Sequence, residues 1–354
     1  MLVVAGVDCH RDSHSIVFLD GVGKVLKQLT IPTTQSGYAS ALKAAKLFDE
    51  VIWGLEGTGS YASAFAHVLF EAKMVIYEVP GNYTKRHRQH GSQRGKSDLV
   101  DAKAIAEAVL REAERLPRYQ PSPEREAIRL RYDQRDRLVR ERTTLVNRLR
   151  SAALRLDLKQ PPSLRSHISL HQIESAARKL QGKNVALDAL VDEALYAVED
   201  IRKIDLRVQE IESLLRPLTR RIAPELLATY GVSTIIAAGL IGHAGDLCNV
   251  RNSDAFAMRC GTAPLSCSSG QRNAVRVNRG GNRQLNRLLH TTALVQVRSG
   301  NHQGYRYYQR KLAEGKSSKT ALRALKRQLT TIIYYRLSSC AERLIEGWQQ
   351  LKAA

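Results

Sequence analysis

Hydrophobic and polar positions in the first third of the chain follow two periods. Short apolar runs predict strands at 2–8, 14–20, 25–31, 50–56 and 73–79. Apolar side chains spaced by three and four positions predict helices at 36–48, 61–72 and 97–114, with Ser36 and Ser97 as N-caps. The turn sequence GVGK joins the second and third strands into a hairpin. This order predicts an α/β domain that opens with a hairpin.

Two long helical patterns dominate the middle of the chain. Prolines cluster at 116–123, and a charged helix is predicted at 124–158, where the Arg-rich face either lies along nucleic acid or is simply solvated. A second helix is predicted at 186–216. Its apolar residues form a heptad seam at Ile201, Ile204, Val208, Ile211 and Leu215. Two antiparallel helices of one chain and a dimerising coiled coil both fit this seam.

The last third is helical and rich in glycine. Pro217 and Pro224 mark a boundary before it. The segment GVSTIIAAGLIGHAGD at 231–246 resembles a helix–hairpin–helix unit, whose exposed amides can hold a phosphate, and an ordinary tight turn is the alternative. We therefore expect three domains: an α/β domain at 1–117, a helical coiled-coil linker at 118–217, and a mostly helical domain at 218–354.

The charge of the chain narrows its function. The 354 residues include 55 Lys and Arg against 34 Asp and Glu, a formal net charge of +21. This surplus indicates a polyanionic partner such as nucleic acid, and a solubilising surface charge is the alternative. The charge is clustered, because residues 79–97 and 255–313 contain no acid. In the first stretch the candidate nucleic-acid contacts are Lys85, Arg86, Arg88, Arg94 and Lys96.

Three further features indicate a reducing, aqueous compartment. The five cysteines form no CxxC pair and fit no zinc module. The chain starts with a strand-like segment and has no basic region before an apolar stretch, so we expect no signal peptide. Its longest apolar runs, such as TIIAAGLIG, are too short to cross a bilayer. We expect a cytoplasmic protein with no membrane partner.

Four carboxylates carry the candidate chemistry. Asp8 and Glu56 each end an apolar run, and Asp98 and Asp101 lie three positions apart on one side of a predicted helix. A carboxylate at the end of a buried strand is costly unless it binds a proton, a cation or a ligand. Taken singly, these acids are turn caps or helix-dipole partners. Taken together, they predict a site for Mg²⁺, which prefers oxygen ligands and often acts as a pair in enzymes that cut phosphodiesters.

A second group of candidate residues lies at 260–287, in the segment CGTAPLSCSSGQRNAVRVNRGGNRQLNR. A loop bounded by proline and glycine is expected to carry Ser266, Ser268 and Ser269. Five candidate nucleic-acid contacts follow it: Arg272, Arg276, Arg279, Arg283 and Arg287. A serine hydroxyl beside guanidinium groups suits phosphoryl transfer through a covalent intermediate. The alternative is a flexible turn whose arginines only grip phosphates.

These residues carry a resemblance to a known family. The GVD of Asp8, the GLEGTGSY block of Glu56 and the segment KSDLVDAKAIAE look like the N-terminal domain of the DEDD transposases of bacterial insertion sequences. That family includes the pilin-gene invertases and the bridge-RNA-guided recombinases. The segments GVSTIIAAGLIGHAGD, CGTAPLSCSSG and NRGGNRQLNRLLHTTA are similar to its C-terminal domain. The resemblance covers about two-thirds of the chain.

The resemblance implies a fold, a cofactor and partners. The fold would be a RuvC-like domain of ribonuclease H type, a helical linker and a C-terminal transposase domain. The four acids would hold Mg²⁺, and Ser269 would attack DNA to form a phosphoserine link, with Ser268 favoured if the register is shifted. Guided members also bind a noncoding RNA that pairs with donor and target DNA. The family implies a homo-oligomer, a dimer or tetramer, in the bacterial nucleoid.

Two other functions compete with this DNA recombinase. One is a metal-dependent nuclease or junction resolvase, in which water attacks and the serine region only grips DNA. The other is a nucleic-acid-binding protein on a decayed nuclease scaffold, which the presence of all four acids disfavours. His10 and His14 lie close to Asp8 in the sequence, and we expect them at the surface rather than in the site.

Overall fold

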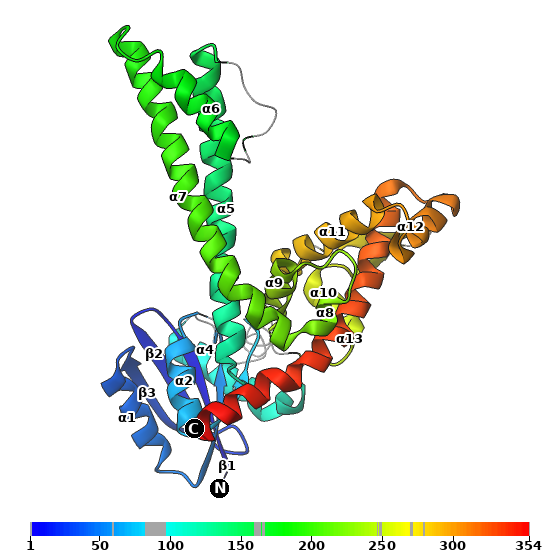
Figure 1. Ribbon diagram of the computed structural model, residues 1–354. Helices are drawn as coiled ribbons and strands as arrows, with labels where there is room; N and C mark the ends of the chain where they lie inside the picture. The colour runs from blue at the N-terminus through cyan, green and yellow to red at the C-terminus, as the bar shows by residue number, and fades with distance from the viewer. Residues whose placement is uncertain are drawn as a thin grey trace. The chain divides into compact units, whose positions relative to one another are not determined.

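The chain forms two compact units, Met1–Pro121 and Ser122–Ala354. The computed structural model, drawn in Figure 1, describes residues 2–58, 60–81, 97–158, 164, 167–245, 247, 250–269, 272–278 and 280–353. Only the backbone is described at 115, 266–269, 272–275, 277 and 341–353. The expected division into three domains stays a prediction.

A five-stranded mixed sheet forms the centre of the first unit. Its strands are β1 (Leu2–Cys9), β2 (Ser13–Leu19), β3 (Val25–Pro32), β4 (Glu50–Leu55) and β5 (Val75–Glu78). They lie in the order β3-β2-β1-β4-β5, with β1, β2 and β3 antiparallel and β4 and β5 parallel to β1. This is the order of the ribonuclease H-like fold that the resemblance implies. The predicted fold class and the opening hairpin are confirmed.

Helices cover both faces of this sheet. α1 (Gln35–Ala45) and α2 (Ser63–Glu71) share one hydrophobic cluster with the sheet, and α4 (Asp98–Glu112) shares another. Ser97 caps α4 as expected, because its side chain accepts a hydrogen bond from the amide of Val100. The cap of α1 is Thr34 and not Ser36, which lies inside the helix.

The period of β1 decides which face its residues occupy, because alternate side chains of a strand point to opposite faces. Val3, Ala5 and Val7 belong to the cluster beneath α1 and α2. Val4 belongs to the cluster beneath α4. Asp8 has the same parity as Val4, so the strand places its carboxylate on the α4 side of the sheet.

Two glycines let α4 lie close to the sheet. Gly6 of β1 and Gly54 of β4 are direct neighbours in the parallel pairing. A Cβ on Gly6 would lie 2.1 Å from the carbonyl oxygen of Ala102 and 2.3 Å from the amide nitrogen of Ala106, both in α4. A Cβ on Gly54 would lie 2.5 Å from Cγ2 of Val109. The helix therefore packs on bare backbone, which brings its first turn beside the end of β1.

The second unit begins with a long antiparallel helix pair. α5 (Pro123–Arg155) and α7 (Val185–Ile222) pack along each other, and the shorter α6 (His167–Arg178) packs against α7 (Figure 1). The heptad seam faces inward in this chain, since Ile201 is 0% and Leu215 0% exposed. Of the two alternatives for the seam, the structure shows antiparallel helices of one chain. The seam therefore no longer supports a dimer.

Ion pairs fix the register of this helix pair. Arg135 Nη2 lies 2.8 Å from Glu212 Oε1, and Arg142 Nε lies 2.6 Å from Asp205 Oδ1. The two bridges are seven residues apart on both helices. Each of these arginines of α5 is thereby neutralised by an acid of α7, which weakens the expectation that the Arg-rich face of α5 lies along nucleic acid.

Pro217 does not end the second long helix, contrary to the expectation. It lies inside α7, with its ring exposed. A proline removes one backbone hydrogen bond and strains the preceding turn, but Thr219 and Ile222 are buried beyond it, and this packing carries the helix on. The helix ends five residues later, at Ile222, and Pro224 begins α8 (Pro224–Leu227).

The remaining helices pack around one large core. They are α9 (Thr234–Ala244), α10 (Ser253–Cys260), α11 (Arg283–Arg298), α12 (Gln303–Ala313) and α13 (Ser318–Ala353). Phe256, Leu289 and Ile333, each 0% exposed, come from α10, α11 and α13 and share this core with Ile128 of α5. The expected helical C-terminal region is confirmed.

The glycines of α9 serve packing. A Cβ on Gly239 would lie 2.7 Å from the ring of Tyr132, and one on Gly242 would lie 2.8 Å from the Cα of Arg129. Both partners belong to α5, so α9 and α5 cross at close range. Helix packing accounts for these glycines of the 231–246 segment, and the helix–hairpin–helix unit stays a prediction.

The serine segment is a strand and not the expected loop. β6 (Pro264–Ser269) pairs antiparallel with β7 (Arg272–Val277), and Ser269 lies opposite Arg272. The polar residues of β6 give no apolar pattern from which a strand would be predicted. β7 does contain Val275 and Val277, whose branched side chains favour an extended backbone.

Candidate active site

Asp8 and Asp98 meet beside the end of β1. Asp8 is the last residue but one of β1, and Asp98 is the first residue of α4. His10 lies between them, with its Nε2 3.1 Å from Asp8 Oδ2 and 3.3 Å from Asp98 Oδ1. One ligand atom from each of these three residues lies within 4.8 Å of the others. These atoms are close enough for one ion to bind them together.

Glu56 and Asp101 lie near the same point. Glu56 directly follows β4, the parallel neighbour of β1, and Asp101 lies one turn beyond Asp98 in α4. A Cβ on Gly81 would lie 2.7 Å from Glu56 Oε1, so this carboxylate rests against bare backbone. Asp101 has a buried Oδ1. Both residues are close enough to Asp8 for their charges to affect its protonation.

Asp8 shows the electrostatic state of this cluster. Burial raises the pKa of Asp8 above its ordinary value, and the negative charges of Asp101, Asp98 and Glu56 raise it further. His10 acts in the opposite direction and lowers this pKa. Like charges around one partly buried carboxylate repel each other, and a divalent cation removes that repulsion. The donor set of carboxylate oxygens and one imidazole therefore fits a hard divalent cation, with carboxylates predominating.

The two histidines depart from the expectation in different ways. His10 is half exposed, yet it contacts both Asp8 and Asp98 instead of standing apart from the site. His14 is 0% exposed and stacks on Tyr38, with ring centroids 5.9 Å apart. It belongs to the core of the first unit. The reason is the strand period, which turns His14 of β2 toward α1 and α2.

Ser269 is described by its backbone only, and most of the candidate basic contacts lie outside the described residues. Ser269 belongs to the second unit and ends β6, with its backbone paired to Arg272. Arg276 is exposed in β7, and Arg283 is the exposed first residue of α11. The following candidates lie outside the described residues: Lys85, Arg86, Arg88, Arg94, Lys96 and Arg279.

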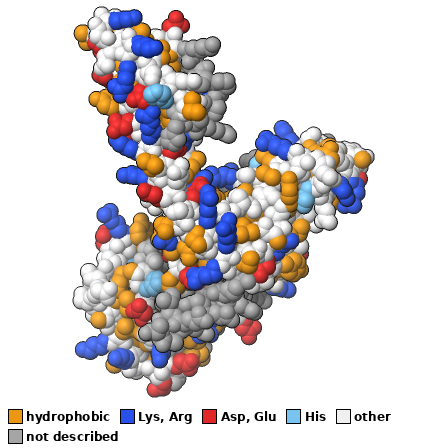
Figure 2. Space-filling model, in the orientation of Figure 1, with side chains coloured by type: hydrophobic (Ala, Val, Ile, Leu, Met, Phe, Trp, Pro, Cys, Tyr) orange, Lys and Arg blue, Asp and Glu red, His pale blue; other side chains and the backbone are white. Residues whose placement is uncertain are grey.

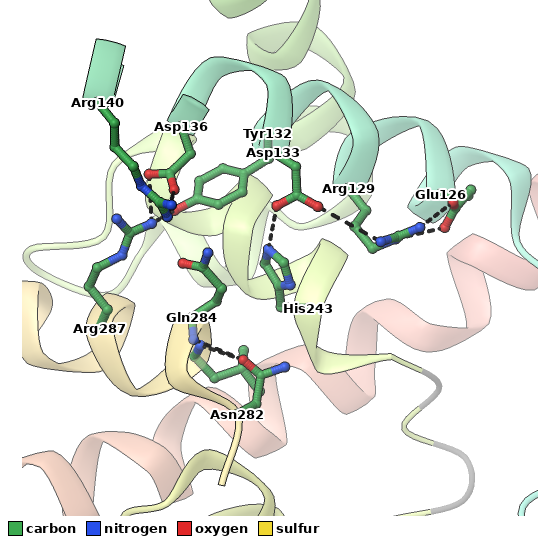
Figure 3. Close-up of polar contacts among 11 residues, drawn as sticks. Glu126, Arg129, Tyr132, Asp133, Asp136, Arg140, His243, Asn282, Gln284 and Arg287 are labelled. Carbon is green, nitrogen blue, oxygen red and sulfur yellow. Dashed lines mark hydrogen bonds and ion pairs between the residues drawn. The ribbon is translucent and has the colours of Figure 1, made fainter. Parts of the chain in front are cut away.

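Arg287 is held by a partly buried polar network (Figure 3). Its Nη2 donates to Asp136 Oδ1 at 2.7 Å and to the hydroxyl of Tyr132 at 3.3 Å, both on α5. Asp136 also accepts a hydrogen bond from Arg140. Neighbouring His243 of α9 contacts Asp133 at 2.9 Å. Arg287 therefore joins α11 to α5, while its side chain is still 44% exposed.

Basic side chains are spread widely over the protein. Figure 2 shows Lys and Arg on the helix pair of the second unit and on its C-terminal helices, interleaved with hydrophobic side chains. Among the described residues, no helix is long and apolar enough to span a membrane.

Comparison with known protein families gives two matches. A family model of IS110-type DEDD transposases matches residues 5–156, and one described as "Transposase IS116/IS110/IS902 family" matches residues 223–309. The first range contains the four acids, and the second contains β6, β7 and α11. Together the two matches cover about two-thirds of the chain.

Individual relatives are similar along nearly the whole chain. The uncharacterized 44.8 kDa protein of insertion element IS116 from Streptomyces clavuligerus is 23% identical over 93% of both chains. The uncharacterized 42 kDa protein of IS900 from Mycobacterium paratuberculosis is 23% identical over 94% of both. Among solved structures, T. thermophilus RuvC in complex with Holliday junction substrate is 16% identical, with a TM-score of 0.28. The match covers 34% of this chain and 100% of the RuvC chain.

Proposed function

The chain belongs to the DEDD transposases of bacterial insertion sequences, and we propose that it recombines DNA through a Mg²⁺ site and a serine nucleophile. The ligands of Mg²⁺ would be Asp8, Glu56, Asp98 and Asp101. The meeting of Asp8 and Asp98 around His10, within 4.8 Å, is the observation that carries the proposal. Asp8 and Asp98 are 90 positions apart in the sequence. The fold brings them together because α4 packs closely on Gly6 and Gly54.

The metal ion, the serine and the arginines would each have a separate role in the reaction. Mg²⁺, when bound, would neutralise charge that develops on the phosphodiester. Ser269 Oγ would form a bond to phosphorus, the bond from phosphorus to a sugar oxygen would break, and the released hydroxyl would take up the proton that serine loses. The exposed arginines Arg276 and Arg283 would hold the negative phosphate oxygens. The hydroxyl of a second DNA strand would then bond to phosphorus and release Ser269, and this step would rejoin the DNA.

Two further parts of the proposal rest on the family resemblance and the net charge. A noncoding guide RNA would select donor and target DNA, and the +21 charge suits RNA and DNA alike. A dimer or tetramer would complete the site. The heptad seam gives this oligomer no support, because it is buried within one chain.

The competing function is a metal-dependent nuclease or junction resolvase in which water attacks. It needs the same acids, so the metal site does not separate the two. The covalent intermediate does, because only the recombinase links the protein to DNA.

Trapping that intermediate tests the nucleophile. Ser269→Ala should abolish the covalent protein–DNA adduct in a denaturing gel and still bind DNA. Ser268→Ala is the matched control from the same strand and should retain the adduct. If Ser268→Ala loses the adduct and Ser269→Ala keeps it, the nucleophile is Ser268. If the wild-type protein cleaves DNA without forming an adduct and both variants cleave equally well, water is the nucleophile.

A second pair of variants tests the acids. Asp8→Asn should fold and bind DNA but lose Mg²⁺-dependent cleavage by about 10²-fold or more. Asp12→Asn is the control, because the Asp12 side chain is 93% exposed and lies outside the acidic cluster. Cleavage by Asp8→Asn at the rate of Asp12→Asn would remove the metal-site proposal. Sequencing the nucleic acid that co-purifies with wild-type protein tests guidance, and only a defined noncoding transcript supports it.

A further inference from the structure

A basic pocket lies between α11 and α13 of the second unit. Its volume is about 480 Å³. From α11 it is lined by Arg283, Arg287 and His290, and from α13 by Lys319, Arg323 and Lys326. Residues at steps of three and four share one face of a helix, so each helix turns one basic stripe into the pocket. The remaining lining residues are Asn286 and Leu322, and none is an acid.

Most of this positive charge has no counter-ion among the residues that the structure describes. Arg287 is paired with Asp136. In the part of the chain that the structure describes, no carboxylate lies within 4.0 Å of the cationic groups of Arg283, Lys319 or Arg323. Elsewhere in this unit, basic side chains such as that of Arg135 lie beside an acid, here Glu212. The pocket differs because its cations face each other.

The two partly buried basic residues of the pocket respond to that charge. Burial lowers the pKa of Lys326, and the neighbouring charge of Arg323 lowers it further. Burial also lowers the pKa of His290, with a further contribution from Lys326. Cations crowded in a partly buried space repel each other, and an anion between them removes this cost.

Lys326 is held in a fixed position. Its Nζ donates to Asn286 Oδ1 at 2.6 Å. Asn286 is oriented in turn, because its Nδ2 donates to the carbonyl oxygens of Cys260 at 2.9 Å and Gly261 at 3.1 Å. An ammonium group has three donors, so this contact leaves two. Such preorganisation lowers the entropy cost of binding a ligand.

We propose that this pocket binds a phosphodiester group of a nucleic-acid strand, with Arg283, Lys319, Arg323 and Lys326 as its charged contacts. Arginine forks and a lysine point charge are the usual donors to phosphate oxygens. The choice of nucleic acid over another anion rests on the proposed function and on the acid-free stretch 255–313, which contains α11. Binding at this pocket does not require cleavage. Lys319, Arg323 and Lys326 lie outside the motifs that the sequence singles out.

A charge-removal experiment on the full chain tests the pocket. The variant is Lys319→Gln with Arg323→Gln, two exposed side chains at the start of α13 whose loss leaves the core intact. The control is Lys183→Gln with Arg207→Gln, which removes the same charge from exposed positions of the same unit. Fluorescence anisotropy measures affinity for duplex DNA, single-stranded DNA and RNA of arbitrary sequence over a salt series.

We expect the pocket variant to bind about tenfold more weakly near physiological salt, and the slope of log affinity against log salt to fall by about one to two. The control should stay within about twofold of wild type. The strand type with the largest loss identifies whose phosphate occupies the pocket. Equal weakening by variant and control, at equal unfolding midpoints, overturns the inference. Asp8→Asn should bind like wild type, so failure of the catalytic proposal would leave this result intact.

Discussion

Replacing Gly6 by alanine should press α4 away from the sheet. The added Cβ would lie 2.1 Å from the carbonyl oxygen of Ala102 and 2.3 Å from the amide nitrogen of Ala106, whereas ordinary contact is 3.4–4 Å. Both atoms are backbone, so no side-chain rotation relieves the clash. The helix must therefore retreat by about 1 Å or more.

This retreat affects stability and the site together. Overpacking a core costs about 1–3 kcal/mol, and we expect the upper end, about 3 kcal/mol, because Ile105 and Val109 lock α4 onto the sheet at 0% and 1% exposure. The same movement separates Asp98 from Asp8. A misplacement of about 1 Å in catalytic groups costs about 10²-fold in rate.

Gly37→Ala is a matched control for this experiment. A Cβ on Gly37 would lie 2.1 Å from the carbonyl oxygen of Pro32, so the strain is similar, but it falls on α1 and not on α4. Urea unfolding measures stability, and Mg²⁺-dependent cleavage is compared under conditions where both variants are folded. We expect Gly6→Ala to lose cleavage and Gly37→Ala to retain it. Equal cleavage by the two variants, or wild-type stability of Gly6→Ala, would show that close packing of α4 on Gly6 does not position the acids.

Two further predictions concern stability. His14→Phe should reduce the loss of stability on acidification: burial lowers the pKa of His14 below 6.5, so the unfolded chain binds a proton first and stability falls as pH drops through that range. Urea midpoints between about pH 5 and 8 check this, and an unchanged pH slope contradicts it. Asp136→Asn should cost about 2 kcal/mol by urea unfolding, because it removes the buried carboxylate charge that pairs with Arg287. Glu199→Gln, at an exposed pair, should cost almost nothing, and equal costs would show that the network adds no stability.

The candidate acids can be found in the sequence because their signals are local. Asp8 and Glu56 end apolar runs, and Asp98 follows a serine cap, so each position can be found within a few residues of sequence. A stronger signal lies beside them: Gly6 and Gly54 each stand two residues before an acid, in GVD and GLE. In strands, residues two apart share a face, so this spacing indicates acids on the side where a helix packs closely.

The features that the sequence does not predict depend on tertiary packing. The contact of His10 with Asp98 exists because α4 approaches β1, which no local pattern encodes. Lys319, Arg323 and Lys326 share a helical face, yet an exposed basic stripe is common on long helices and becomes a pocket only when α11 packs opposite. Local sequence rules predict that a helix ends at Pro217, but α7 continues past it because Ile222 is buried in the core.

The two bridges of Arg135 with Glu212 and Arg142 with Asp205 stand one heptad apart on antiparallel helices. Matched seven-residue deletions from α5 and α7 would therefore preserve the phase of the apolar seam and the facing of the charges. Each step would shorten the arm by about 10 Å without a new interface. The α5–α7 helix pair can therefore change length in whole-heptad steps, while intermediate lengths would turn the apolar seam toward water.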